Sequence, residues 1–203
     1  MAITINGTGS ITGLTAGGLP DGSITAADIE TSLDLTGKTV TLPSGTGGKI
    51  LQVVQVVEQG VITFGTSLGD ALTASITPSS TNSNILVQWS MHMGRGVDDY
   101  GEIKLYRDGS QVSGATSTGN TGSSPNATSG IFNRAAIGGD VHFVQCLAGS
   151  YLDSPATTSS TTYVMKTRCT YGSNVYLNRA ETFNNNLGYA VGTISSLTLF
   201  EVA

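Results

Sequence analysis

The 203-residue chain carries a net charge of −5, and only 11% of its residues are charged. Its nine lysines and arginines are scattered along the sequence, which argues against nucleic-acid binding and membrane-surface binding, because both need clustered positive charge. No apolar run reaches the roughly 20 residues of a membrane-spanning helix, and the N-terminus lacks the pattern of a secretory signal. We therefore expect a chain that is neither inserted into a membrane nor exported.

The first 48 residues differ in composition from the rest, because they contain no aromatic residue, arginine or cysteine. Thr25-Ala-Ala-Asp28 has the spacing of a capping box, which predicts a short helix from about Ala26 to Ser32. A segment of this size buries too little apolar surface to fold alone. Partner chains or the following domain must cover its isoleucines and leucines, so the sequence favours an oligomer.

The stretch SLDLTGKT, residues 32–39, differs from a phosphate-binding loop only at its first position, where that motif has glycine. Such a loop binds phosphate when it leads into a helix N-terminus. Here Lys38 is followed by TVTLP, and a second Gly-Lys pair at Gly48–Lys49 is followed by ILQVVQVV; both sequences are typical of strands. We interpret the stretch as a turn between strands, and we expect no nucleotide or other cofactor.

From residue 49 onward, strand-like segments follow one another, separated by turn signals such as Asp108-Gly109 and Gly138-Gly139. We predict strands over 50–57, 61–64, 71–77, 84–93, 102–107, 131–137, 140–152, 161–171, 174–178 and 193–202. Many short strands with almost no helical periodicity predict a mainly β protein, an antiparallel β-sandwich of jelly-roll-like type. The chain thus divides into an N-terminal attachment segment, 1–48, and a β head, 49–203.

Alternation of apolar and polar residues assigns the faces of the two longest segments. In 84–93 the predicted core face holds the only tryptophan, with His92 on the opposite, wetter face; this core face consists of Ile85, Val87, Trp89, Met91 and Met93. In 161–171 the predicted core face holds Tyr163, Met165, Cys169 and Tyr171, opposite Lys166 and Arg168.

The two cysteines, Cys146 and Cys169, lie in predicted strands and not in a cysteine-rich framework. Without an export signal, we expect two buried free thiols, with a disulfide as the alternative. His92 and His142 have no second ligand at a useful spacing, so we expect no metal site.

Three polar stretches join the predicted strands. Pro78 and Pro155 each precede a Ser/Thr cluster, and because proline cannot donate to a strand ladder, each marks a corner between strands. The segment Ser113–Gly130 is long and polar, and we expect either a mobile surface loop or a loop ordered by neighbouring chains.

Four stretches resemble the tail-fibre and other virion proteins of tailed bacteriophages. They are the junction 36–43 with 47–54, the segments 74–87 and 152–163, and the ending 194–202. The resemblance implies a homotrimeric appendage of the virion, with an N-terminal segment that docks to other virion proteins and a jelly-roll-like head that contacts the host surface. A host glycan or protein is then a further partner. Because the chain is short for a whole tail fibre, a capsid decoration or head-fibre protein is the alternative.

Some appendages of this kind cleave polysaccharide with a pair of carboxylates. Here the candidates are Asp98, Asp99 and Glu102, but the first two are neighbours in a glycine-rich loop and no pair stands out. The chain has no Gly-x-Ser-x-Gly motif, and its acidic residues lack the spacing of a calcium loop. We therefore expect no enzymatic activity, and a polysaccharide-cleaving spike is the more distant alternative.

Exposed loop residues are the candidate contacts with a host surface. The first group is Asp98, Asp99 and Tyr100. The second group is Asn184, Asn185, Asn186 and Tyr189. Tyrosine offers an aromatic face and a hydroxyl group, and asparagine amides can pair with sugar hydroxyls. The alternative for the asparagine run is a simple turn, because asparagine tolerates left-handed backbone conformations.

Overall fold

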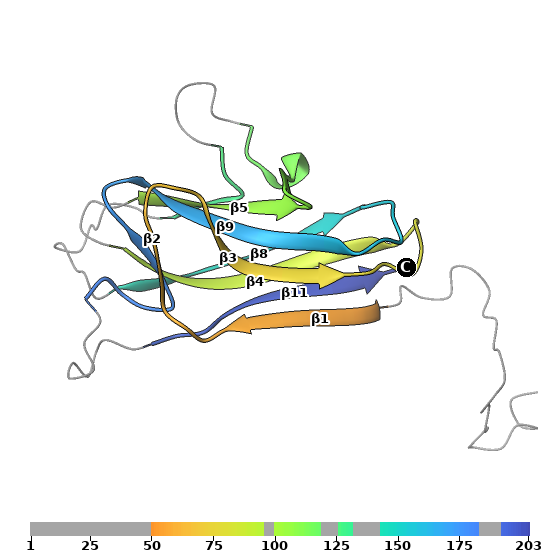
Figure 1. The fold of residues 1–203 in the computed structure, drawn as a ribbon, viewed down its shortest axis with the longest axis horizontal. Coiled ribbons are helices and arrows are strands. Elements are labelled where there is room, and N and C mark those ends of the chain that lie inside the picture. The colour runs from red at the N-terminus through yellow and green to blue at the C-terminus, as the bar shows by residue number, and fades with distance from the viewer. Residues whose placement is uncertain (1–49, 96–99, 119–125, 132–142, 183–191) are drawn as a thin grey trace, which may run out of the picture. The chain divides into compact units, whose positions relative to one another are not determined.

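The structure is a computed structural model that describes residues 50–95, 100–118, 126–131, 143–182 and 192–203 (Figure 1). The chain divides into two units, Met1–Thr46 and Gly47–Ala203, and every described residue belongs to the second. The predicted helix of residues 26–32 and the stretch SLDLTGKT lie outside the described residues. The sequence after Lys49 is described, and it is a strand, as predicted.

Eleven strands and one turn of 3₁₀-helix make up the regular structure of the described residues. In chain order they are β1 (Ile50–Glu58), β2 (Ile62–Phe64), β3 (Gly69–Ile76), β4 (Asn84–Arg95), β5 (Tyr100–Arg107), β6 (Ser110–Gln111), η2 (Ser113–Ala115), β7 (Ser129–Ile131), β8 (Val144–Asp153), β9 (Thr161–Tyr171), β10 (Val175–Leu177) and β11 (Ser195–Val202). The predicted strands match these to within a few residues, except 131–137, of which only Ile131 is described. Alternation cannot predict β6, because two residues show no period.

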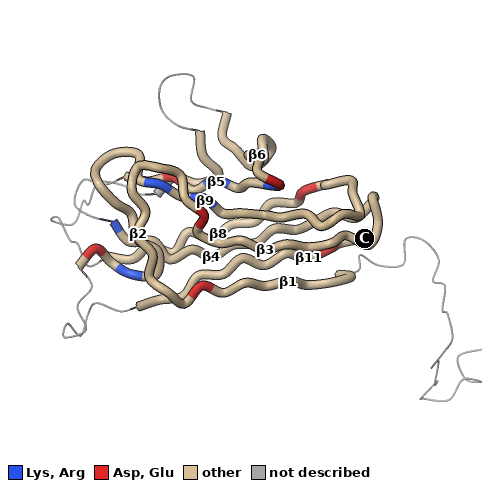
Figure 2. The backbone as a smooth tube through the Cα atoms, viewed as in Figure 1, with Lys and Arg blue, Asp and Glu red and all other residues tan. Residues whose placement is uncertain are grey.

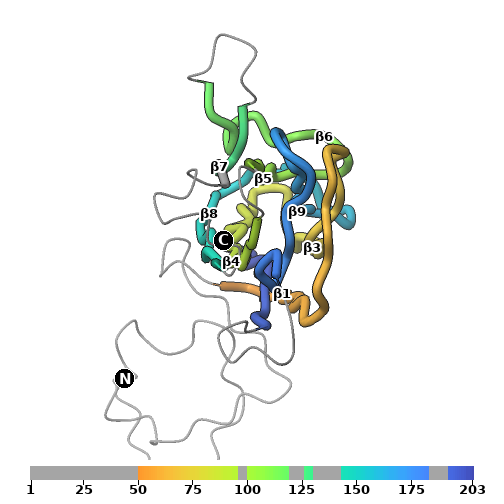
Figure 3. Tube along the Cα trace, turned by 90° about the vertical axis from the view of Figure 1, so that its left-hand side faces the viewer, coloured from red at the N-terminus to blue at the C-terminus, as the bar shows by residue number. Residues whose placement is uncertain are grey.

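The strands form two antiparallel sheets that pack face to face (Figures 1 and 3). Sheet A has the order β1-β11-β4-β10-β2, and β8 also pairs with β4. Sheet B has the order β3-β9-β5-β6, and β7 also pairs with β5. The long strands β1, β3, β4, β5, β8, β9 and β11 alternate between sheet A and sheet B along the chain. This is the connectivity of a jelly roll, so the predicted antiparallel sandwich of this type is confirmed.

One hydrophobic cluster fills the space between the sheets. The predicted core face of β4 is confirmed, because each of its five residues, Ile85, Val87, Trp89, Met91 and Met93, is at most 5% exposed. Sheet B contributes the fully buried side chains of Ile103, Leu105, Tyr163 and Met165. Because burying one large apolar side chain stabilises the fold by about 1.5–3 kcal/mol, this alternation fixes the register of both sheets.

The corners and the solvent face also follow the sequence pattern. Pro78 lies in the corner after β3, and Pro155 lies in the corner after β8. Lys166 and Arg168 lie on the face of β9 opposite the buried Met165, as predicted.

Two predictions of burial are wrong. Tyr171 is 67% exposed, because the pairing of β5 with β9 shifts: Gly101 lies opposite Cys169, but Tyr100 lies opposite Tyr171. The extra residue on β9 inverts the alternation, and sequence periodicity cannot show such a bulge. Cys146 is exposed, because it lies on the outer face of β8; neither cysteine is in a disulfide, but only Cys169 is buried.

Candidate functional site

Of the seven predicted contact residues, the structure describes one. Tyr100 is the first residue of β5, at the edge of a gap in the described chain. The other six, Asp98, Asp99, Asn184, Asn185, Asn186 and Tyr189, lie outside the described residues. The site is therefore built from Tyr100 and the described residues around it.

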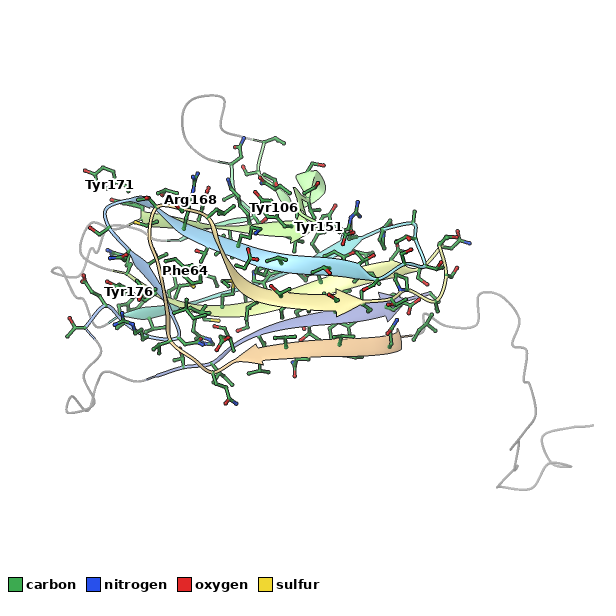
Figure 4. All side chains as sticks on the ribbon, in the orientation of Figure 1. Phe64, Tyr106, Tyr151, Arg168, Tyr171 and Tyr176 are labelled. Atoms are coloured by element: carbon green, nitrogen blue, oxygen red, sulfur yellow. The ribbon has the colours of Figure 1, made fainter. Side chains whose placement is uncertain are left out.

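Tyr100 belongs to a patch with Tyr171 and Arg168, which we call the tyrosine–arginine patch. The rings of Tyr100 and Tyr171 meet edge to face, with centroids 5.8 Å apart and an angle of 73° between their planes. Figure 4 shows Tyr171 and Arg168 on the side of sheet B that faces away from sheet A. The bulge in β9 produces this patch, because it turns Tyr171 out of the core and toward Tyr100.

A buried carboxylate holds Arg168 in place. Glu102 is 2% exposed, and its Oε1 accepts a hydrogen bond from Nε of Arg168 at 2.7 Å and pairs with Nζ of Lys104 at 3.0 Å. Its second oxygen, Oε2, is buried without a hydrogen-bond partner. Because the bond to Glu102 uses Nε, it orients the guanidinium and leaves the two terminal nitrogens outside this contact.

Beyond Lys104 the loop after β6 forms an open groove of about 450 Å³, which we call the Lys104 groove. The loop is folded by its own side chains: the hydroxyl of Thr116 donates to the carbonyl of Val112 at 2.8 Å and accepts from Gln111 at 2.9 Å. The groove is lined by Lys104, Gln111, Ser113, Thr116, Ser117, Thr118 and Asn126. Apart from one lysine, its lining consists of hydroxyl and amide side chains.

Two buried oxygen atoms lie beneath this region. Oδ1 of Asn126, in the wall of the Lys104 groove, is buried without a hydrogen-bond partner, as is Oε2 of Glu102. Buried polar atoms are normally paired, so these two oxygens are exceptions beneath the groove, and the ligand contacts offered by the groove come from its exposed hydroxyl and amide groups. Hydroxyl groups donate and accept, and a sugar also offers an apolar face that can lie on a tyrosine ring.

Most acidic side chains of the described residues form hydrogen bonds or ion pairs within the fold. Six of the seven accept a hydrogen bond from the chain or pair with one of its cations, and these are Glu58, Asp70, Glu102, Asp108, Asp153 and Glu201. Asp153 accepts from Arg107 and from the hydroxyl of Tyr163, both at 2.6 Å. Burial, together with the hydrogen bond to Asp153, raises the pKa of Tyr163. The hydrogen bond to the same carboxylate raises the pKa of Arg107.

Glu201 is the most enclosed of these carboxylates, with no exposed surface. It accepts hydrogen bonds from the amide and the hydroxyl of Ser79, at 2.7 and 2.6 Å, and from the amide of Gln52 at 2.7 Å. Burial alone would raise the pKa of this carboxyl, but the donors, led by Ser79, outweigh burial and lower the pKa to about 2. Glu201 therefore joins β1, β11 and the corner after β3 as a structural anion.

The remaining observations concern metals and membranes. No three His, Cys, Asp or Glu side chains gather in the part of the chain that the structure describes. Within the same residues, no helix has the length and apolar character needed to cross a bilayer.

Sequence reasoning finds some of this surface and misses the rest. Alternation places Lys166 and Arg168 on the outer face, and the glycine-rich loop points to Tyr100. Tyr171 is missed because of the bulge, and the Lys104 groove is missed because its loop has no periodic pattern. The tyrosines as a class are the one available signal, since aromatic residues make up only 6% of the chain.

No known protein-family model matches the sequence, and no curated protein matches it.

Proposed function

We propose that this chain is a structural component of a phage virion, a short homotrimeric tail fibre or spike whose β head binds a polysaccharide of the host envelope. The virion part of the proposal is supported by the resemblance of the four stretches named above. The binding part is supported by the tyrosine–arginine patch and the Lys104 groove, which together offer aromatic rings, hydroxyls, amides and two cations on one face.

One observation carries the binding proposal: the bulge in β9 that turns Tyr171 outward. A tyrosine in this strand would contribute more to stability in the core than at 67% exposure. Here it instead completes an edge-to-face pair beside a fixed arginine. Exposed aromatic rings next to oriented donors form the contact surface that a polyol needs. The carboxylates in this region are held by the scaffold, which favours binding over polysaccharide cleavage.

The test is binding of the full chain to a panel of immobilised bacterial envelope polysaccharides. We expect at least one to bind, and Tyr171→Ala to weaken that binding about tenfold, which corresponds to roughly 1.4 kcal/mol. The matched control is Phe143→Ala, because Phe143 is a similarly exposed aromatic, at 51%, outside the patch. Equal affinity of Tyr171→Ala and the unchanged chain for a bound polysaccharide would contradict the assignment of the patch.

The virion part of the proposal has its own test, because it predicts where the chain is found. Antibody labelling of purified particles should mark the tail or its baseplate. Labelling confined to the capsid would instead support the alternative of a decoration or head-fibre protein. Loss of polysaccharide viscosity on adding the chain would contradict a purely structural role and support the cleaving spike.

A further inference from the structure

On the described strands of sheet A, no charged side chain stands on the outer face, the one that points away from sheet B. Charged residues occur in the strands of this sheet only at the last or second-last position, and they are Glu58, Arg95, Asp153 and Glu201. Figure 2 shows the same distribution along the backbone. The middle of β1, β11, β4 and β8 is therefore a neutral surface, although the chain carries a net charge of −5.

Cross-strand pairing arranges this surface in rows. Val53 lies opposite Phe200, Phe200 opposite Leu86, and Leu86 opposite Leu152, so that one apolar row crosses four strands. At the two ends of the row, Val53 is 54% exposed and Leu152 is 55% exposed. Large apolar side chains that stand together in water, instead of singly, mark an interaction surface.

A polar row follows the apolar row, and it forms a shallow hollow. Gln55, Thr198, Gln88 and Ser150 lie opposite one another in that order across the same strands. With Ser90, Ala148 and Ser196 of the next row, they line an open hollow of about 440 Å³. An apolar ridge beside a hollow lined mostly by uncharged polar residues gives the face the relief that a packed interface needs.

We propose that the outer face of sheet A packs against a second copy of this chain. This inference rests on the homo-oligomer of the proposed function, and it names the surface that the copies share. The absence of charge favours a like partner: copies that each carry −5 repel one another, and they can approach with least repulsion through a face without charge.

The size of the face supports the same occupant. Its four strands are at least eight residues long, and at about 3.3 Å per residue and 4.8 Å between strands they project an area of about 500 Å². Side chains raise the accessible area above the projected area, toward the roughly 800 Å² per partner of a stable interface. Two copies can pack through this face directly. In a trimer, each of the three copies can point this face toward the threefold axis.

The experiment measures the native mass of the full chain by light scattering over a range of concentrations. We expect a multiple of 20.8 kDa. The double variant Val53→Lys/Leu152→Lys adds two charges to the apolar row and should raise the dissociation constant at least a hundredfold. Both positions are more than half exposed, so the variant should keep its circular dichroism spectrum. Its melting temperature should fall only by the amount that loss of the partner explains, and it should no longer depend on protein concentration.

The matched control places a lysine on the other sheet. Thr73 is an exposed residue on the outer face of β3, and Thr73→Lys should leave the mass unchanged. A second measurement uses Cys146, which lies on the outer face of sheet A opposite His92, whereas Cys169 is buried. A thiol reagent should label Cys146 slowly in the oligomer and at least tenfold faster in the double variant.

Three results would overturn the inference. A wild-type chain that is monomeric at every concentration has no second copy on this face, although binding of polysaccharide through Tyr171 would still support the host-contact proposal. A double variant with unchanged mass and unchanged labelling of Cys146 would show that the copies meet through another surface. A monomer in which Cys146 is protected at every concentration would show that the same chain covers the face.

Discussion

The two outer faces of the sandwich are built from strands of the same kind, but they differ in charge. Sheet B carries Asp70, Glu102, Lys104, Lys166 and Arg168 on its outer face, within strands β3, β5 and β9. Sheet A carries none there, and its buried carboxylates Asp153 and Glu201 lie at strand ends. Burial therefore determines the inner face of both sheets, whereas the outer faces differ in charge. This difference is the reason why we propose a polysaccharide contact on sheet B and a second copy of the chain on sheet A.

The largest expected effect follows from the carboxylate at the end of sheet A. Ser79 and Gln52 donate to different oxygens of Glu201, so Glu201→Gln keeps one acceptor and places an NH₂ group against the donors of the other residue. Because the site is fully buried, we expect a loss of about 3 kcal/mol in the free energy of unfolding. Urea denaturation measures it.

A double-mutant cycle supplies the control. If Glu201 and Ser79 act as one unit, Ser79→Ala should cost much less in the Glu201→Gln background than in the wild type. If the losses in the free energy of unfolding are additive, the two residues are not coupled. Glu201 would then not hold the corner after β3 against sheet A through Ser79.

The same residue makes the stability depend on pH. The folded-state pKa of Glu201, about 2, lies below its ordinary value of 4.5, so its contribution is fully present above about pH 4.5. It is lost as the pH falls from 4.5 toward 2, and the loss amounts to about 3 kcal/mol for a shift of this size. Unfolding curves between pH 6 and pH 2.5 should therefore show a slope that Glu201→Gln reduces; an equal slope in both proteins would contradict this prediction.

An intermediate effect on stability is expected in sheet A, where an inner residue and an outer residue of β8 can be compared. Gly149 lies opposite Trp89, and a Cβ on Gly149 would stand 2.4 Å from Cζ2 of the indole ring. Gly149→Ala should therefore cost about 1–3 kcal/mol through overpacking. Thermal unfolding measures it, and the neighbouring Ser150→Ala on the outer face should change stability by less than about 0.5 kcal/mol. Equal effects of the two variants would contradict the assignment of faces.

The sequence predicts the parts of this fold that repeat and misses those that interrupt the repeat. Alternation is enough for β4, because its five apolar residues bury together, and the proline corners mark the ends of β3 and β8. It fails at Tyr171, where a single extra residue in β9 inverts the faces. The Lys104 groove depends on hydrogen bonds between side chains of one loop, and such contacts leave no period in the sequence.

Cys146 shows a further limit of sequence reasoning. Composition favours burial of a free thiol, and only the strand's pairing shows that Leu147, the next residue, takes the inner position. Likewise, the neutral face of sheet A is visible only when four strands that lie far apart in the sequence are aligned by their registers; Val53 and its partner Phe200, for example, are 147 positions apart. The chain order alone does not bring Val53, Phe200, Leu86 and Leu152 together.

The smallest expected effect is on the outer face of sheet B. Asp70 pairs with Lys166, which lies opposite Lys104, but Asp70 is 57% exposed. Asp70→Asn should therefore cost about 0.5 kcal/mol or less, and the cost should shrink further in high salt, because water and ions screen an exposed pair. Urea denaturation at low and high salt measures both quantities. A loss above about 1.5 kcal/mol, insensitive to salt, would make the outer charges of sheet B as structural as Glu201, and the division between a solvated face and a protein-covered face would then have to be abandoned.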